Sequence, residues 1–434
     1  MLAYFLHRSF RKNKRISLCQ TLGITNNDQR RRDSTLLKKA FHTVDHTAEH
    51  SAKEYSRNRS KRFFCLLSVL VLLLLQLPLE AAVADAKEIE ALMADMSLHE
   101  KVCQLFFVAP EQFIREEKVN KTSNAVKRAL ERFPVGGVVL FRQNILSGNA
   151  VTSLNADMQA WACQNHGIGL LIGADEEGGG VSRVAGSLRL TAKQPAAFTL
   201  GQQGEESVEQ AALVIGAYLK DYGFNLDFAP VADVRTQVKR EEIGTRAFSY
   251  DANAASQMVA AFIRGLHTQG IISVAKHFPG HGAVSGNTHT GQGVSVRTLD
   301  EWRECEFLTF RRAMDEGVDM VMVSHQLASK VDPDNPASLS PTIVTELLRG
   351  ELGFEGVVIT DALRMKAISD KYGSGEACVR ALEAGCDMLL LPYNFTNGYN
   401  GVMAALSSGR LTEDRIDDSV RRILLLKQRW GMLH

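Results

Sequence analysis

Short hydrophobic runs recur along residues 87–434, and the stretches between them place apolar residues every three or four positions. Continuous apolar runs of this kind are typical of strands buried on both faces, as in a parallel sheet. The runs predict strands over residues 102–108, 136–141, 169–175, 226–234, 272–278, 319–325, 356–362 and 387–393.

The stretches between these strands are amphipathic and predict helices, for example over residues 123–133, 253–270, 299–317 and 340–352. Several such stretches are followed by glycine, which is favoured just past a helix end. Eight strand–helix units in about 350 residues predict an α/β fold, a single (β/α)8 TIM-type barrel. A doubly wound open sheet is the alternative for the same alternation.

The first 86 residues follow a different pattern. Residues 1–62 are basic and have neither helical nor strand periodicity, so we expect an unstructured leader, and we hypothesise that translation starts further down. Residues 63–79 are apolar and uncharged and precede a small-residue run, the order of a secretory signal. We therefore expect a signal core and cleavage region over 63–86 and an exported catalytic domain over 87–434. That domain would be periplasmic, secreted, or attached to the membrane through an uncleaved 63–79.

Composition and charge narrow the class of protein. Hydrophobic residues make up 45% and charged residues 23% of the 434 residues, which is typical of a packed globular core. The net charge of +1 hides an asymmetry, because residues 1–62 hold 15 basic and 5 acidic side chains, whereas the remainder holds 35 and 44. An acidic body argues against nucleic acid as a partner.

Five cysteines follow the signal, at positions 103, 163, 305, 378 and 386. An odd number at these spacings fits neither a zinc site nor a disulfide framework. We expect mostly buried, reduced thiols, with Cys378 and Cys386 the one pair worth testing for a bridge.

Polar side chains gather where the predicted strands end. Asp175 ends the third strand, Lys276 and His277 the fifth, His325 the sixth, and Asp361 lies at the end of the seventh. In a barrel, this face carries the active site. The chain is therefore expected to be an enzyme.

Asp361 stands in VVITDALRM, where β-favouring residues bring a carboxylate to the mouth of the barrel. A carboxylate at that place can be a nucleophile or a metal ligand. It can also cap a helix that begins directly after it. The residues alone leave the three interpretations open.

Residues 276–294 are rich in glycine and carry His277, His281 and His289. The histidine spacing is not that of a helical zinc motif and no cysteine or acidic partner accompanies it, so we expect no metal. A glycine-rich loop can bring His289 over a bound substrate, and a histidine can give and take a proton near neutral pH.

Two further loops carry charge. Residues 175–183, DEEGGGVSR, place Asp175 and Arg183 around a glycine run that lacks the ending of a phosphate-binding loop. Residues 244–249 place Arg246 after the fourth strand, where a surface ion pair is the commoner role. Asp233 is expected to be a structural hydrogen-bonding partner.

Taken together, six segments resemble family 3 glycoside hydrolases, in particular the single-domain β-N-acetylglucosaminidase branch, over nearly all of residues 90–430. Each motif alone is weak to moderate, but six in the expected order are specific. The segments are residues 96–108, 175–183, 229–234, 244–249, 275–282 with the histidine shortly after, and 357–365.

The resemblance implies a retaining mechanism, in which Asp361 matches the nucleophile and forms a covalent glycosyl-enzyme. His289 matches the acid/base of the single-domain branch, in which a histidine on a mobile loop replaces a glutamate from a second domain. The residues that match those holding the terminal sugar are Asp175, Arg183, Arg246, Lys276 and His277.

One position departs from the pattern. The branch pairs its histidine with an aspartate two residues earlier, and this chain has Asn287 there. Asparagine can orient the imidazole but supplies no charge. Three interpretations stay open: another carboxylate substitutes, activity persists with an altered pH profile, or the protein only binds sugar.

The resemblance thus implies a β-N-acetylhexosaminidase that removes terminal non-reducing N-acetylglucosamine from cell-wall fragments or chitin-type oligosaccharides, without a cofactor. A β-glucosidase or β-xylosidase, a phosphorylase that uses phosphate in place of water, and a non-catalytic envelope sugar-binding protein are the alternatives.

Overall fold

The computed structural model describes residues 87–114, 117–236, 242–286 and 288–434. The chain divides into two units at residue 82, and all the described residues lie in the second unit, residues 83–434. The predicted leader over 1–62 and signal over 63–86 lie outside the described residues and stay predictions. Within the part of the chain that is described, no helix combines the length and apolar character needed to cross a membrane.

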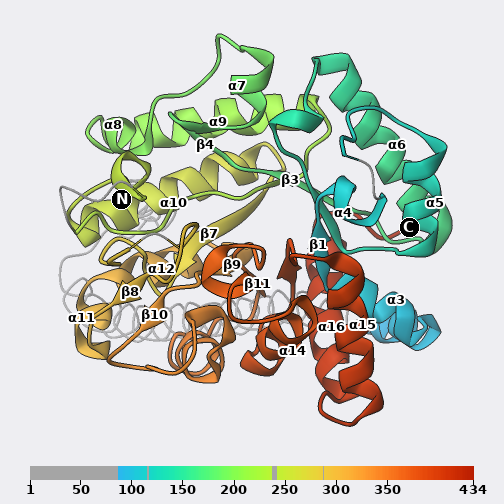
Figure 1. The fold of residues 1–434 in the computed structure, drawn as a ribbon. Coiled ribbons are helices and arrows are strands. Elements are labelled where there is room, and N and C mark those ends of the chain that lie inside the picture. Colours follow the sequence, from blue (N-terminus) through green and yellow to red (C-terminus); the bar gives the residue numbers. More distant parts are fainter. Residues whose placement is uncertain (1–86, 115–116, 237–241, 287) are drawn as a thin grey trace, which may run out of the picture. The chain divides into compact units, whose positions relative to one another are not determined.

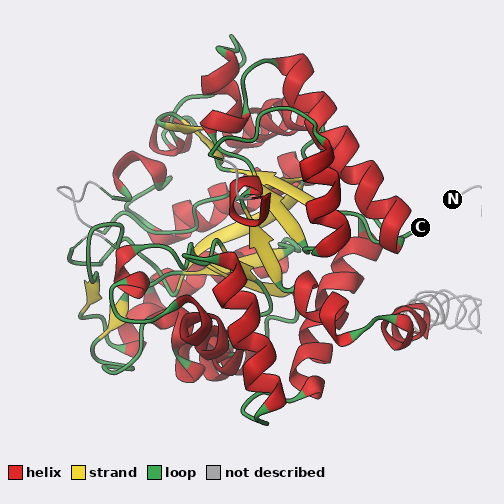
Figure 2. Cartoon of the chain, turned by 45° about the vertical axis from the view of Figure 1, so that its right-hand side comes forward, coloured by secondary structure: helices red, strands yellow, loops and turns green. Residues whose placement is uncertain are grey.

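Eight parallel strands form the centre of the second unit (Figure 2). Around the ring they follow one another in chain order, so each strand–helix unit places its strand beside the previous one. The strands are β1 (Phe106–Val108), β2 (Gly137–Val139), β3 (Leu171–Ala174), β6 (Leu226–Asp227), β7 (Ile272–Phe278), β9 (Met320–Val323), β11 (Val357–Thr360) and β12 (Leu389–Leu390).

The ring closes where the last strand meets the first. β12 pairs with β1 through Phe106 and Leu389, and a parallel bridge joins Ile359 of β11 to Met388. The amide of Thr360 donates to the Met388 carbonyl at 3.1 Å. The sheet is therefore a nearly closed eight-stranded barrel, which confirms the predicted fold and makes the open-sheet alternative wrong.

Helices surround the strands (Figures 1 and 2), as the amphipathic stretches predict. Those between or after barrel strands are α5 (Asn124–Arg132), α6 (Gly148–His166), α9 (Glu205–Asp221), α10 (Ala252–Thr268), α11 (Leu299–Glu304), α12 (Glu306–Asp315), η4 (Thr342–Glu351), α14 (Ser374–Ala384), α15 (Phe395–Ser407) and α16 (Glu413–Arg429).

Shorter elements decorate the loops. The short helices are α3 (Leu98–Gln104), α4 (Pro110–Ile114), α7 (Val184–Leu188), α8 (Ala197–Gly201), α13 (Lys366–Ser369), and the 3-10 turns Arg142–Asn144, Gly244–Arg246 and Ala337–Leu339. Two small sheets pair β4 (Glu176–Gly178) with β5 (Val181–Ser182), and β8 (Val294–Ser295) with β10 (Leu327–Ala328).

The first predicted strand begins too early. Residues 102–104 belong to α3, and the strand starts at Phe106. Ser97 and Glu100 form a capping box, in which the Ser97 amide donates to Glu100 Oε2 at 2.8 Å and the Glu100 amide donates to Ser97 Oγ at 3.3 Å. This local helix signal outweighs the apolar run that follows it.

Other predicted elements also differ from the observed ones. The helix expected over 299–317 is two helices, because the backbone of Cys305 leaves helical geometry at φ −129° and ψ −82°. The helix over 340–352 is a π-helix over Thr342–Glu351. The strand expected over 226–234 is regular only at Leu226–Asp227, beyond which one bridge joins Val231 to Lys276.

Aromatic rings pack inside the barrel against glycine-containing strands. The Phe107 and Phe228 rings meet edge to face at 5.1 Å between centroids, and both residues are buried. A Cβ at Gly137 would lie 2.4 Å from the Phe107 ring, and one at Gly173 would lie 2.8 Å from Leu226. The two glycines therefore let large side chains from neighbouring strands fill the interior.

All five cysteines within residues 87–434 are free thiols, Cys163 and Cys305 are only partly buried, and the pair Cys378 and Cys386 forms no bridge. Both lie in the core, where burial raises the pKa of Cys378 out of its usual range and that of Cys386 to about 12. They are unreactive packing residues.

Candidate active site

A cavity of about 790 Å³ opens at the carboxyl ends of the barrel strands. Every predicted site residue that the structure describes contributes to its wall, whereas Asn287 lies outside the described residues. These wall residues are Asp175, Arg183, Arg246, Lys276, His277, His289 and Asp361.

Asp361 follows β11 directly. Its Oδ1 accepts a hydrogen bond from the backbone amide of Ala362 at 2.7 Å. Burial would raise the pKa of Asp361, but the imidazoles of His325 and His277 and the Ala362 amide outweigh burial, and the pKa lies below its usual value. The next helix, α13, begins only at Lys366, so the helix-cap interpretation of Asp361 is wrong.

Lys276 occupies the floor of the cavity. Its Nζ lies 2.8 Å from Asp175 Oδ1 and 2.7 Å from Glu177 Oε1, and the side chain is 2% exposed. Burial alone would lower the pKa of Lys276, but the two carboxylates raise it above its usual value. The ammonium is therefore a fixed positive charge in a desolvated place.

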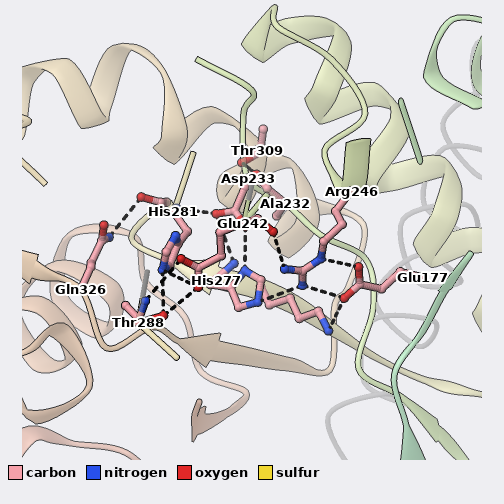
Figure 3. A network of polar contacts seen from close by, with 12 residues as sticks. Glu177, Ala232, Asp233, Glu242, Arg246, His277, His281, Thr288, Thr309 and Gln326 are labelled. Atoms are coloured by element: carbon pink, nitrogen blue, oxygen red, sulfur yellow. Dashed lines mark hydrogen bonds and ion pairs between the residues drawn. The ribbon is translucent and has the colours of Figure 1, made fainter. Parts of the chain in front are cut away.

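Arg246 and Glu177 form a bidentate pair beside this lysine (Figure 3). Arg246 Nε lies 2.7 Å from Glu177 Oε2, and Nη2 lies 2.8 Å from Oε1. Burial opposes ionisation of Glu177, but Arg246 and Lys276 hold its pKa far below its usual value. A buried pair of this geometry fixes the arginine in one rotamer, so the commoner surface role does not apply here.

Asp233 determines how His277 presents its ring. Asp233 Oδ2 lies 2.7 Å from His277 Nδ1, and Arg246 Nη2 lies 3.4 Å from His277 Nε2. Arginine can only donate, so His277 Nε2 accepts a hydrogen bond from Arg246, and the Nδ1–H of His277 donates one to Asp233. Asp233 is 1% exposed and also accepts from the His281 amide at 2.5 Å, which confirms its expected structural role.

Arg183 lies at the side of the cavity, after β5. Its Nε is 4.0 Å from Asp175 Oδ2, beyond hydrogen-bonding distance. In the described part of the chain this buried Nε has no hydrogen-bond partner. An unmet donor on a cavity wall is suited to a ligand oxygen.

His289 lies on the loop between β7 and β8, where its exposed side chain also lines the cavity. Its charge is among those that lower the pKa of Asp361, so the two groups act on one another. The preceding Thr288 is 1% exposed and donates from Oγ1 to Glu242 Oε1 at 2.8 Å.

Two more histidines lie near these residues, and one of them, His281, also lines the cavity. His281 is 4% exposed, and burial lowers its pKa. His325 is fully buried, with Nδ1 2.7 Å from Ser338 Oγ and Nε2 3.0 Å from the Ala362 carbonyl. Burial lowers the pKa of His325 as well. It therefore positions the backbone beside Asp361.

Sequence reasoning missed Glu177, Glu242 and the role of His281. Glu177 had a readable signal, because residues two apart on a strand share a face, and Glu177 stands two after Asp175. Glu242 had none, since its contacts with Thr288 join positions 46 residues apart.

Among the residues that the structure places, no group of three or more histidine, cysteine, aspartate or glutamate side chains is arranged to hold a metal ion. The charged groups of the cavity instead contact one another, since Lys276 meets Asp175 and Glu177, and Glu177 also meets Arg246.

The arrangement has counterparts among known proteins. The family model described as "Glycosyl hydrolase family 3 N terminal domain" matches residues 97–426. The chain belongs to glycoside hydrolase family 3. Within the family, it is 39% identical over 267 residues to a β-hexosaminidase of Stenotrophomonas maltophilia, an alignment that covers 60% of this chain and 77% of that protein.

Solved structures of family 3 agree. A β-N-acetylhexosaminidase from Beutenbergia cavernae is 30% identical with a TM-score of 0.69, covering 77% of this chain and 99% of that one. A β-N-acetylglucosaminidase from Paenibacillus is 35% identical with a TM-score of 0.73, and the match spans 78% of this chain and 63% of that longer chain. The chain is thus a glycoside hydrolase and, by homology, a β-hexosaminidase.

Proposed function

We propose that this family 3 enzyme is a retaining exo-β-N-acetylglucosaminidase. It removes terminal non-reducing N-acetylglucosamine from cell-wall fragments or chitin-type oligosaccharides through a covalent glycosyl-aspartate intermediate. The observation that carries the proposal is that Asp361, with a pKa below its usual value, and His289 line one cavity beside a cluster of fixed charges. Relatives named β-hexosaminidase support the choice of sugar.

In the first step, a carboxylate oxygen of Asp361 attacks the anomeric carbon and the bond from this carbon to the leaving oxygen breaks. His289, in its protonated form, gives its proton to that oxygen, so the leaving group departs as a neutral alcohol. The hydrogen bond from Ala362 holds the attacking carboxylate in one orientation.

In the second step, neutral His289 takes a proton from water, and the resulting hydroxide oxygen forms a bond to the anomeric carbon. The bond between that carbon and Asp361 breaks, which restores the carboxylate. Two displacements at one carbon retain its configuration. The exposure of His289 supports this role, because its proton can exchange with solvent between turnovers.

The charged cluster holds the sugar ring in this proposal. Lys276 and the unmet Nε of Arg183 offer donors to hydroxyl oxygens, and Asp175 offers an acceptor. Such charge-assisted bonds are stronger than neutral ones and depend on the stereochemistry of each hydroxyl. Arg246 and His277 also line the cavity and lie 3.4 Å apart, so they add to the same cluster.

We also propose that the enzyme acts outside the cytoplasm. The support is the sequence over 61–86. Basic residues come first, an apolar stretch over 63–79 follows, and small residues come after it, which is the order of a secretory signal. Cell-wall fragments and chitin-type chains would be met there.

The test is turnover of aryl β-N-acetylglucosaminide and aryl β-glucoside, with and without phosphate, by the purified protein. We expect turnover of the first, β-N-acetylglucosamine as the first-formed anomer by NMR, and loss of at least about 10⁴-fold in Asp361→Asn. Asp315→Asn, an exposed aspartate at the end of α12, is the matched control.

Other outcomes would contradict the proposal. Preferential turnover of the glucoside would indicate a β-glucosidase or β-xylosidase, and sugar 1-phosphate as the product would indicate a phosphorylase. Binding of N-acetylglucosamine without turnover of either substrate would indicate a sugar-binding protein.

A further inference from the structure

Glu242 lies on the loop between β6 and β7, just before the 3-10 turn Gly244–Arg246, and lines the same cavity as His289. Its side chain is 14% exposed. Arg246, four residues further along the chain, donates from Nη1 to the Glu242 backbone carbonyl at 3.1 Å, and its Nε and Nη2 contact Glu177 and His277. The Glu242 carboxylate therefore serves something other than that arginine.

Both carboxylate oxygens of Glu242 meet Thr288 (Figure 3). Oε1 accepts from the Thr288 hydroxyl at 2.8 Å, and Oε2 accepts from the Thr288 backbone amide at 3.3 Å. Two bonds to one buried residue fix its position and its orientation.

The carbonyl of Thr288 is held as well. It accepts from the backbone amide of Ala367 at 3.3 Å, in α13 and six residues after Asp361. This carbonyl belongs to the peptide group that it shares with the nitrogen of His289, and that group is planar. The contacts of Thr288 with Glu242 and with the Ala367 amide therefore fix the backbone from which the His289 side chain extends.

His281 completes the anchor. Its Nε2 lies 3.4 Å from the Thr288 hydroxyl and 3.8 Å from Glu242 Oε1. Burial lowers the pKa of His281, which favours the neutral ring. The Thr288 hydroxyl donates its one hydrogen bond to Glu242, so the hydroxyl oxygen can accept a hydrogen bond from His281 Nε2.

We propose that Glu242 is the positioning residue for the acid/base His289, acting through Thr288 to hold the imidazole over Asp361. The proposal rests on the function proposed above. In this role Glu242 supplies, from a different loop, the carboxylate that the branch has as an aspartate at the position of Asn287. Glu242 does not touch the reacting atoms in this role and transfers no proton itself.

The test compares two substrates that differ in their need for an acid. Chitobiose has a poor leaving group that must be protonated, whereas 2,4-dinitrophenyl β-N-acetylglucosaminide has one that needs no proton. Since kcat/KM reports glycosylation, Glu242→Ala and Thr288→Val should lower kcat/KM by about 100-fold on chitobiose and by less than about 3-fold on the aryl substrate.

Two further measurements separate positioning from a structural role. Azide needs no base, so it should restore kcat of Glu242→Ala on the dinitrophenyl substrate and yield the β-glycosyl azide. In Glu242→Ala/His289→Ala, the loss on chitobiose should not exceed that of His289→Ala alone, because Glu242 acts through His289.

The matched control is a glutamate–threonine contact of the same kind on the surface. Thr298 donates from its amide to Glu301 Oε2 at 2.8 Å and from its hydroxyl at 3.2 Å, at the start of α11. Glu301→Ala and Thr298→Val should leave the ratio between the two substrates unchanged.

Equal losses on the two substrates, no loss on either, or additive losses in the double variant would each overturn the role of Glu242. In all three cases the unaltered protein still hydrolyses both substrates, and the proposed function stands. Absence of turnover by the unaltered protein contradicts the proposed function and this inference with it.

Discussion

Glu177 is the residue that holds the charged cluster of the cavity together. It receives Lys276 at 2.7 Å and Arg246 in a bidentate pair, and it is 4% exposed. Removing one partner of a buried charge group leaves the others uncompensated, which is costlier than losing a surface pair. Glu177 therefore affects both binding and stability.

Glu177→Gln should lower the free energy of unfolding by about 3 to 5 kcal/mol and raise KM, because two buried cations lose their counter-ion. Urea unfolding and steady-state kinetics measure the two effects. Glu209→Gln is the control, since Glu209 pairs with Arg264 at 2.9 Å on the surface and should cost less than about 1 kcal/mol. Equal costs for the two variants would contradict the buried role.

For individual site residues, the sequence predicts the side chains at strand ends but not the contacts between side chains on different loops. Asp175, Lys276, His277 and Asp361 could be placed because barrel strands end at one face. Glu242 could not, because its meeting with Thr288 depends on the path of two long loops, and no local pattern encodes that path.

Among the elements, β2 shows how closely neighbouring strands are fitted. Gly137 leaves room for the Phe107 ring of β1, and an added Cβ would lie 2.4 Å from it. A contact under 3 Å forces one of the two groups to move, and extra atoms in a filled core are destabilising.

Gly137→Ala should therefore lower the free energy of unfolding by about 1 to 3 kcal/mol. Adding Phe107→Leu, which removes the ring, should make the Gly137→Ala cost smaller than in the wild-type background. Thermal unfolding of the four variants of this cycle measures the coupling. Additive effects would show that Phe107 is not what limits the space at Gly137.

The start of α12 carries a carboxyl group that titrates near neutrality. Burial raises the pKa of Glu306 from its ordinary 4.5 to about 7, although Arg297 lies 3.3 Å away and opposes the shift. The folded state therefore favours the protonated form. The stability that Glu306 contributes is full below pH 4.5 and is lost as the pH rises to about 7.

Compared with Glu306→Gln, the wild-type free energy of unfolding should fall by about 3 kcal/mol between pH 4.5 and 7.5, from about 1.36 kcal/mol per pKa unit. Urea unfolding of both proteins across this range gives the difference. A difference that is independent of pH, or that grows in favour of the wild type as the pH rises, would contradict this assignment.

The elements themselves follow from the sequence more closely than their boundaries do. All eight strands lie within predicted runs, because apolar runs flanked by polar turns specify buried parallel strands. The capping box at Ser97 and the break at Cys305 moved boundaries, since caps and backbone breaks depend on single residues inside an otherwise regular pattern.

For the whole molecule, the barrel explains why distant segments share one site. Asp361 and His289 belong to different strand–loop units, yet both reach one cavity of about 790 Å³, because the ring of parallel strands gathers all its carboxyl ends. The solved β-N-acetylhexosaminidase of family 3 from Beutenbergia cavernae has a similar fold, with a TM-score of 0.69.

In the proposed mechanism, Asp361 becomes covalently bound to the sugar. The direct measurement is intact-mass and peptide mass spectrometry of the protein after incubation with 5-fluoro-β-N-acetylglucosaminyl fluoride, which forms the glycosyl-enzyme faster than it is released. We predict one added sugar on the peptide that contains Asp361, and none in Asp361→Asn. A label on another residue, or full turnover of chitobiose by Asp361→Asn, would contradict the mechanism.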